Sequence, residues 1–263
     1  MNTTLNTIVV GLVSIAFAAS AAAQSSPTLA RIKGEGVLRV AMADSPPSQS
    51  KNPGTDAWEG YNVDMAEDLA QVLDVRLEII DSTWATLIPG LLAEQYDICM
   101  VDMFATPERA QTVVFTDAYN TLGYSFLVRG DSAYQDWEDL NDPQVTIATL
   151  SGTSGEPFVQ QHLPEATMRS IVSDNNYAPH MEVMNGRADA HITDHVNNIL
   201  FMQNNPNADL RTVPDGEPLL NATGLAYAIR PGDPHFHAFL NTWIRYIADS
   251  GQAERLRKKW FGF

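Results

Sequence analysis

Two hydroxyl side chains lie in a glycine-rich turn, a kind of segment in which proteins place nucleophiles and anion-binding groups. Gly152-Thr153-Ser154-Gly155-Glu156 differs from the G-x-S-x-G elbow of serine hydrolases, because Glu156 stands where the second glycine belongs. Thr153 and Ser154 precede a predicted helix over residues 156–162, and backbone N–H groups at a helix start favour an anion. We expect this turn to contact an anionic group, with an ordinary helix N-cap as the alternative.

Metal and redox chemistry have little support in the sequence. The six histidines are scattered, at positions 162, 180, 191, 195, 235 and 237. His191 and His195 have the i,i+4 spacing that can bind a metal on a helix, but Thr193-Asp194 between them predicts a strand-to-helix turn, so we expect surface histidines. The chain has no H-E-x-x-H, C-x-x-C or Walker motif, and its one cysteine, Cys99, is predicted to be a buried thiol. The sequence predicts no metal and no cofactor.

Length and charge limit the classes of protein to consider. A chain of 263 residues can form one large α/β unit or two lobes of about 100 residues each. Its apolar fraction of 44% is enough for substantial cores, which argues against global disorder. The net charge of −16 disfavours nucleic acid as a partner, because phosphate binding needs clustered Lys and Arg.

The first 23 residues have the pattern of a secretory signal peptide. An apolar run from Ile8 to Phe17 is too short for a spanning helix with normal flanks, and Ala21-Ala22-Ala23 before Gln24 is an A-x-A cleavage pattern. The residues before this run contain no Lys or Arg, which is atypical, and an N-terminal anchor helix is the alternative. We expect residues 1–23 to be removed and the mature protein to be soluble and periplasmic.

The chain after Gly36 alternates short β-rich runs with helical patterns. The runs that predict strands are residues 37–42, 75–80, 97–101, 145–150 and 222–229. The segments that predict helices include residues 63–73, 84–93, 156–162 and 234–260. This alternation predicts mostly parallel sheets flanked by helices.

Two lobes explain this order of elements better than one barrel does. The chain would cross between them twice, near residues 121–128 and 219–227. We expect lobe 1 to comprise residues 24–122 and 225–263, and lobe 2 to comprise residues 123–224. Ligands of open α/β sheets bind beyond the carboxyl ends of the strands, so we expect the site in the cleft between the lobes.

Several short motifs follow one another in a fixed order. They are Glu59-Gly60-Tyr61-Asn62-Val63-Asp64-Met65-Ala66, the W-x-x-L-I-P-x-L-x-x-x-x-x-D pattern from Trp84 to Asp97, Thr106-Pro107-Glu108-Arg109, Phe115-Thr116-Asp117-Ala118-Tyr119, Gly152-Thr153-Ser154, and Gly186-Arg187-Ala188-Asp189-Ala190 through Asp194. Together they resemble the family 3 extracellular solute-binding proteins, the amino-acid receptors of ABC importers, from about Gly36 to Phe261. The resemblance implies the two-lobed α/β fold of type II periplasmic binding proteins, with two crossover hinge strands.

The resemblance also implies which residues hold the ligand. Arg109 corresponds to the arginine that binds the ligand α-carboxylate, and a guanidinium fork fits a carboxylate bidentately. Thr153 and Ser154 correspond to the turn on the other side of that carboxylate, and Asp194 to the aspartate for the α-ammonium. The alternatives are an exposed Arg109 paired with Glu108, and a helix N-cap at Asp194.

Two further positions are implied less specifically. Trp84 corresponds to an aromatic residue that often stacks on the ligand side chain, with a place in the core as the alternative. Asp44, at the end of the first strand, is a candidate for ligand contact, with loop capping as the alternative.

The segment between Asp97 and Thr106 departs from the family pattern, which has small hydroxyl residues there. Phe104 replaces a common serine, so the pocket should be narrower and lack one hydrogen bond. Asp102 adds a negative charge that could receive a basic side chain or the ammonium group, with a solvated rim carboxylate as the alternative.

A catalytic branch of the same fold, the periplasmic cyclohexadienyl (arogenate/prephenate) dehydratases, is the enzyme alternative. Dehydration with decarboxylation needs a general acid, which that branch takes from a glutamate in the second crossover. Thr223 aligns with that position, and Glu217, the nearby acid, stands six positions early. We therefore expect a receptor rather than an enzyme: a monomer that binds a small carboxylate, most simply an amino acid, and delivers it to an ABC permease in the inner membrane.

Overall fold

The structure is a computed structural model of the chain, and it describes residues 26–216 and 219–262. The predicted signal peptide at residues 1–23 lies outside the described residues. In the part of the chain that is described, no helix has the length and apolar character needed to cross a membrane.

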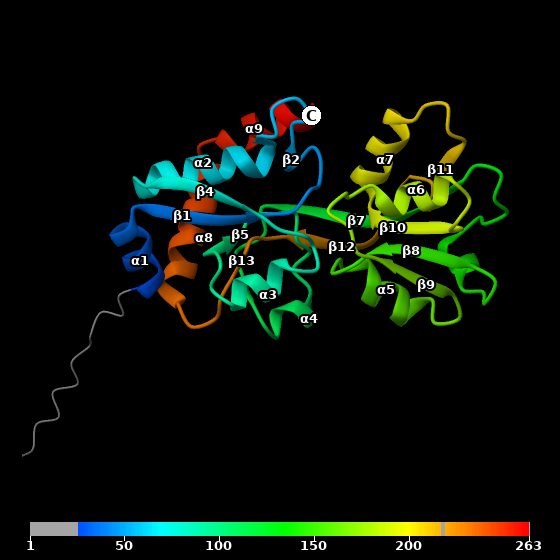
Figure 1. Ribbon diagram of the computed structural model, residues 1–263, viewed down its shortest axis with the longest axis horizontal. Coiled ribbons are helices and arrows are strands. Elements are labelled where there is room, and N and C mark those ends of the chain that lie inside the picture. The colour runs from blue at the N-terminus through cyan, green and yellow to red at the C-terminus, as the bar shows by residue number, and fades with distance from the viewer. Residues whose placement is uncertain (1–25, 217–218, 263) are drawn as a thin grey trace, which may run out of the picture.

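The polypeptide forms two lobes, each built around its own sheet (Figure 1). The strands of the lobe 1 sheet are β1 (Val37–Met42), β4 (Arg76–Asp81), β5 (Ile98–Cys99), β6 (Val114–Phe115) and β13 (Ala228–Ile229). Their order is β4-β1-β5-β13-β6, with β1 parallel to β4 and β5. Strands β4, β1, β5 and β6 run in one direction, as predicted for a mostly parallel sheet, whereas β13 enters from the other lobe and runs antiparallel to β5 and β6. A short hairpin, β2 (Ser50–Lys51) with β3 (Trp58–Glu59), precedes the second helix.

The helices of lobe 1 follow the apolar pattern of the sequence. They are α1 (Pro27–Glu35), α2 (Tyr61–Leu73), α3 (Leu87–Leu92), α4 (Pro107–Ala110), α8 (Pro234–Asp249) and α9 (Gln252–Phe261). In α2 the predicted apolar face from Val63 to Leu73 is buried against the sheet. The segment predicted to be helical, residues 234–260, forms two helices, because Gly251 has a left-handed φ of 72°, which separates α8 from α9.

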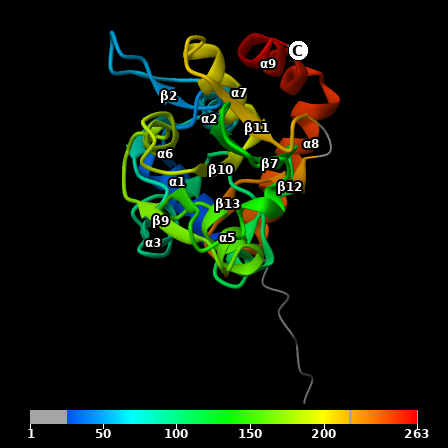
Figure 2. The same cartoon turned by 90° about the vertical axis from the view of Figure 1, so that its right-hand side faces the viewer.

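Lobe 2 repeats the strand–helix alternation around a second core. Its strands are β7 (Asn120–Arg129), β8 (Thr146–Leu150), β9 (Thr167–Ile171), β10 (Ala190–Asp194), β11 (Leu210–Val213) and β12 (Leu220–Leu225), and its helices are η1 (Trp137–Leu140), α5 (Gly155–His162), α6 (Ala178–Met184) and α7 (His195–Asn204). The strand order is β11-β7-β10-β8-β9, and β12 pairs with β7. Helices α6 and α7 cover one face of this sheet and α5 covers the other (Figure 2).

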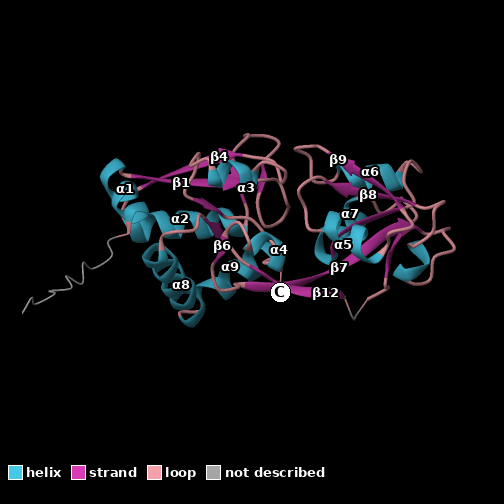
Figure 3. Cartoon of the chain, turned by 90° about the horizontal axis from the view of Figure 1, so that it is seen from below, coloured by secondary structure: helices cyan, strands magenta, loops and turns pink. Residues whose placement is uncertain are grey.

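Two neighbouring strands join the lobes. β7 leaves lobe 1 and β12 returns to it, and they pair antiparallel, with Leu225 opposite Asn120 and Leu220 opposite Tyr124 (Figure 3). The register shifts between Leu220 and Thr223, which marks a β-bulge. This is the two-lobed α/β fold with two crossover strands that the sequence predicts.

The prediction of two surface histidines is wrong for His191. Its ring is buried on β10, where Nδ1 lies 2.9 Å from the carbonyl oxygen of Ala148, whereas His195 is the first residue of α7. The buried His180 ring lies 4.4 Å from the His191 ring, and neither nitrogen of His180 has a hydrogen-bond partner. Burial lowers the pKa of His180 well below 6.5 and that of His191 to about 4, so both rings are neutral in the fold at neutral pH.

We expect lobe 2 to lose stability in acid because of these rings. The unfolded chain binds protons near pH 6.5 and the folded rings do not, so the free energy of unfolding should fall between pH 6.5 and about 4. His191 alone contributes on the order of 3 kcal/mol to this loss. Urea unfolding of His180→Phe at several pH values should show a shallower acid slope than the wild type, and the exposed-residue variant His162→Gln should keep the wild-type slope. A His180→Phe slope as steep as the wild type would contradict the assignment.

Candidate functional site

A cavity lined by residues of both lobes lies between them. Seven of the eight predicted ligand-contact residues line it: Trp84, Asp102, Phe104, Arg109, Thr153, Ser154 and Asp194. The eighth, Asp44, lines a neighbouring and larger cavity together with Asp81 and Asp174. Asp44 still connects the lobes, because its carboxylate accepts a hydrogen bond of 3.4 Å from the backbone N–H of Asn176 in lobe 2.

Arg109 extends from lobe 1 to lobe 2. It lies in the short helix α4, which Thr106 caps with its hydroxyl and Pro107 begins. One guanidinium nitrogen donates to the carbonyl oxygen of Phe104 at 3.1 Å, and another donates to the carbonyl oxygen of Gly152 at 2.9 Å. The predicted carboxylate-binding side chain is therefore held across the cleft, with its planar fork in the cavity wall.

The turn before α5 is fixed by its own hydroxyl groups. Thr153 donates its Oγ1 proton to the carbonyl oxygen of Leu150 at 2.7 Å, and Tyr124 donates to the Ser154 hydroxyl at 2.6 Å. Ser154 stands at the N-cap position, but its side chain makes no capping hydrogen bond. The alternative of an ordinary side-chain cap is therefore wrong, and the start of α5 faces the cavity through Gly155, Ser154 and Thr153.

Asp194 both caps a helix and lines the cavity. It ends β10 and accepts hydrogen bonds from the backbone N–H of Asn197 at 2.9 Å and from its amide at 2.5 Å. Burial, with a smaller contribution from the negative charge of Asp102, raises the pKa of the Asp194 carboxyl to about 6. A cationic group placed beside this carboxyl would favour its ionised form.

Asp102 and Phe104 are the two departures from the family pattern, and both lie in the cavity wall. Asp102 is half-buried rather than a solvated rim carboxylate, and its Oδ1 accepts hydrogen bonds from Asn62 at 2.8 Å and from Tyr119 at 2.6 Å. The Phe104 ring is buried against Tyr124, with ring centres 4.7 Å apart. This apolar contact joins lobe 1 to the first crossover strand.

Trp84 has both of the places considered for it, in the core of lobe 1 and in the cavity wall. Its ring packs against the lobe 1 core near Leu87 and also lines the cavity. Its indole N–H donates to the carbonyl oxygen of Asp44 at 3.2 Å, which fixes the ring orientation.

Five polar residues of the cavity escaped the sequence prediction: Thr193, which is the neighbour of Asp194, and Ser45, Tyr124, Asn176 and Asn197. The amide of Asn197 donates to the Ser45 hydroxyl at 3.2 Å, from lobe 2 to lobe 1, and accepts from Asn176 at 2.9 Å. Only Asn197 carries a local signal, since it stands three residues after the helix cap at Asp194.

The cavity has an excess of negative charge. Among the described residues that line it, the charged side chains are the carboxylates of Asp102 and Asp194 and the guanidinium of Arg109. Where both carboxylates are ionised, a ligand with one net positive charge matches this set. The described residues contain no group of three or more His, Cys, Asp or Glu side chains placed to hold a metal ion.

Thr223, the position that aligns with the general acid of the dehydratases, does not line the cavity between the lobes. Thr223 on β12 is half-buried, donates to the carbonyl oxygen of Asn221 at 2.9 Å, and lines a separate cavity on the hinge side. Glu217 lies outside the described residues.

The two lobes, the paired crossover strands and the cavity between the lobes define a type II periplasmic-binding-protein fold. Residues 38–263 match the bacterial extracellular solute-binding proteins, family 3, and the chain belongs to that family.

Known relatives include both an enzyme and binding proteins. The chain is 27% identical over 259 residues to a cyclohexadienyl dehydratase of Pseudomonas aeruginosa, covering 97% of this chain and 94% of that protein. It is 25% identical over 202 residues to the ABC transporter arginine-binding protein 1 of Escherichia coli, covering 77% and 81%. The crystal structure of an ancestral amino acid-binding protein, a precursor of cyclohexadienyl dehydratase, is similar with a TM-score of 0.79 and 34% identity over 90% of this chain and all of that chain.

Proposed function

We propose that this protein is a periplasmic receptor that closes around an amino acid with a basic side chain. The observation that carries the proposal is that Arg109 from lobe 1 and Asp194 from lobe 2 line the same cavity. A zwitterion contacts both groups only when the cleft is shut. The excess of carboxylate at Asp102 favours a ligand with one additional positive charge, and the arginine-binding relative supports the same class.

In this proposal each end of the ligand has its own partners. The α-carboxylate binds Arg109 and the backbone N–H groups at the turn of Thr153 and Ser154. The α-ammonium binds Asp194, and the basic side chain extends toward Asp102, with Asp44 at the adjoining cavity. Trp84 supplies an apolar face for the ligand side chain.

The energies of these contacts are of the size that closure requires. Shifting a two-state equilibrium from 1:99 to 99:1 takes about 5.5 kcal/mol of differential binding. Two charge-assisted hydrogen-bonded contacts, at roughly 1.5–3 kcal/mol each, contribute most of that amount.

We further propose that the receptor is a monomer that serves an ABC permease of the inner membrane. The signal-like pattern of residues 1–23 and the name of the Escherichia coli relative support this place and partner. The proposed lobes are residues 24–122 with 225–263, and residues 123–224, since β7 and β12 are the strands that connect the sheets.

A thermal-shift screen of the refolded mature chain, residues 24–263, tests the receptor function. The protein is unfolded and dialysed first, because a co-purified ligand would mask added ones. A basic amino acid at about 100 times its Kd should add roughly 2.7 kcal/mol and raise the Tm by several degrees. We expect Arg109→Ala and Asp194→Ala to lose this shift. The control Arg245→Ala, an exposed residue of α8 paired with Asp117, should keep it.

A lyase of the cyclohexadienyl dehydratase type is the second candidate. It is favoured by the length of the Pseudomonas aeruginosa match and by the Asp194 carboxyl, whose pKa of about 6 leaves part of it protonated for acid catalysis. The same preparation is incubated with prephenate. Formation of phenylpyruvate without a shift from any amino acid would reject the receptor function in favour of the lyase.

A further inference from the structure

Two donors of lobe 1 hold one oxygen of the Asp102 carboxylate. Its Oδ1 accepts the hydroxyl proton of Tyr119 at 2.6 Å and an amide proton of Asn62 at 2.8 Å. Both donors act on one oxygen, and the carboxyl group also forms part of the cavity wall. Hydrogen bonds of this kind favour the ionised form of a carboxyl that burial would otherwise keep protonated.

Asn62 is the centre of a wider buried network. It is fully buried, its amide also donates to Gln49 at 2.7 Å, and its Oδ1 accepts the hydroxyl proton of Tyr227 at 2.8 Å. Gln49 in turn donates to the carbonyl oxygen of Ala43 at 2.9 Å. Every polar atom of the Asn62 side chain is therefore oriented by a partner, and its amide cannot rotate away from Asp102 without loss of these bonds.

The two tyrosines of this network stand at the lobe 1 ends of the crossover strands. Tyr119 immediately precedes β7, and Tyr227 follows β12 by two residues. Their rings stack, with centres 4.6 Å apart. The position of Asp102 is thus connected to both strands about which the lobes move.

We propose that Tyr119 and Asn62 are positioning residues that keep Asp102 ionised in the cavity wall, so that a cationic group of the ligand meets a carboxylate attached to both crossover strands. The identity of the ligand in this inference rests on the proposed function. The effect of the two donors on the ionisation of Asp102 can be measured without any ligand.

The other titratable groups near Asp102 do not stabilise its ionised form, so that form depends on the hydrogen bonds. Asp194 faces it across the cavity, and the phenols of Tyr61 and Tyr227 lie close enough for their pKa values to be raised by its charge. Arg109 is the one cation among the described residues of the cavity lining. Burial raises the pKa of Asp102, and the hydrogen bonds from Ser48, Tyr119 and Asn62 lower it.

The test is a ¹³C NMR titration of the aspartate carboxyl carbons in the ligand-free mature protein. The Asp102 signal is assigned as the one missing in Asp102→Asn. Tyr119→Phe removes one donor and should raise the midpoint of Asp102 by about one pH unit. Tyr227→Phe acts only through Asn62 and should raise it less. Tyr96→Phe is the matched control, because this buried phenol of the same lobe donates to the carbonyl oxygens of Thr86 and Leu87 and should not move the midpoint.

A second readout uses the ligand found in the thermal-shift screen. Tyr119→Phe should weaken binding about fivefold at the Asp102 midpoint and should have no effect in an Asp102→Asn background. Unchanged midpoints in both Tyr119→Phe and Tyr227→Phe, or equal losses of affinity in the two backgrounds, would overturn the inference. If no amino acid binds, the proposed function fails, and the NMR midpoints still decide the positioning role.

Discussion

Gly152→Ala is expected to weaken ligand binding by at least about 100-fold, because it prevents the lobes from closing. A Cβ atom at Gly152 in lobe 2 would lie 2.5 Å from the Cα and 2.6 Å from the nitrogen of Ala85 in lobe 1. These contacts are with backbone atoms, which cannot turn aside as the end of a side chain can. Isothermal titration calorimetry measures the affinity, and small-angle X-ray scattering with saturating ligand measures closure.

Gly186→Ala is the matched control for Gly152→Ala. Both glycines lie in lobe 2 with positive φ, +83° for Gly152 and +67° for Gly186, so both variants carry similar backbone strain. A Cβ atom at Gly186 would meet only a guanidinium nitrogen of Arg129, at 3.9 Å. Gly186→Ala should therefore bind ligand normally. Equal affinities for the two variants would show that contact across the cleft does not limit closure.

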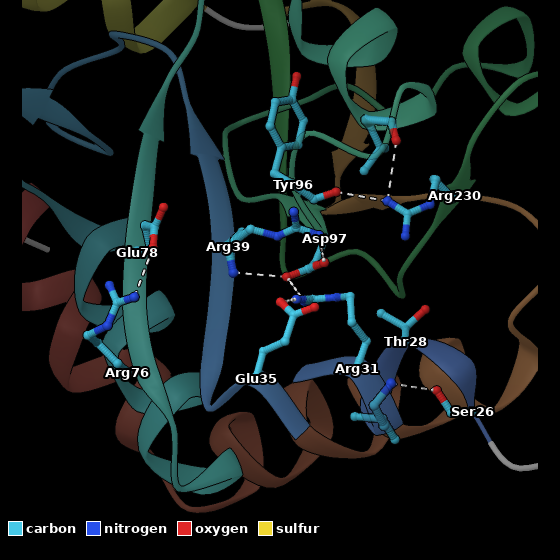
Figure 4. Close-up of polar contacts among 12 residues, drawn as sticks. Ser26, Thr28, Arg31, Glu35, Arg39, Arg76, Glu78, Tyr96, Asp97 and Arg230 are labelled. Atoms are coloured by element: carbon cyan, nitrogen blue, oxygen red, sulfur yellow. Dashed lines mark hydrogen bonds and ion pairs between the residues drawn. The ribbon is translucent and has the colours of Figure 1, made fainter. Parts of the chain in front are cut away.

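Asp97→Ala is expected to lower the free energy of unfolding by about 3–5 kcal/mol, which lowers the Tm by roughly 10 °C. The carboxylate is fully buried and pairs with the guanidinium groups of Arg31 and Arg39 (Figure 4). It also accepts the backbone N–H of Arg39 at 2.9 Å. The Nε atoms of both arginines already lack hydrogen-bond partners, so loss of Asp97 would leave Arg31 with only the exposed carboxylate of Glu35 and would remove the carboxylate partner of the half-buried Arg39.

Urea unfolding of Asp97→Ala and Glu78→Ala separates a buried pair from an exposed one. Glu78 pairs with Arg76 on β4, where both side chains are largely in solvent (Figure 4). Removing that pair should change stability by less than about 1 kcal/mol. If the two variants lost the same stability, the buried cluster beneath α1 would have no special role in holding this helix to the sheet.

The spacing of apolar residues predicted helices and strands well where neighbouring residues alone determine the element. The strand at residues 37–42 has the bounds of β1, and the strand at residues 145–150 differs from β8 by one residue. The helical segment over residues 234–260 was predicted without its break at Gly251, because the apolar spacing continues through that residue, whose left-handed φ separates α8 from α9. The antiparallel direction of β13 in an otherwise parallel sheet has no local signal, since it depends on the return of the chain from the other lobe.

The motifs identified most residues of the candidate site, but they did not predict which of these residues contact one another. Arg109 and Asp194 were selected by type and position, and both line the cavity. Asn197 and Ser45 are separated by 152 positions, and their hydrogen bond exists only because the lobes meet. No local pattern in the chain specifies such a pair.

The sequence alone determined the class of fold and the charged groups that the chain carries to its cleft, because helix and strand periods and motif spacing are properties of neighbouring residues. The closure of one lobe on the other decided the rest. It placed Asp44 in an adjoining cavity and brought Arg109 to Gly152. Folding within each lobe buried His191 and held Asp102 in the wall rather than at the rim. Burial and hydrogen bonding depend on which distant segments fill the space around a residue, and that information appears only once the chain is folded.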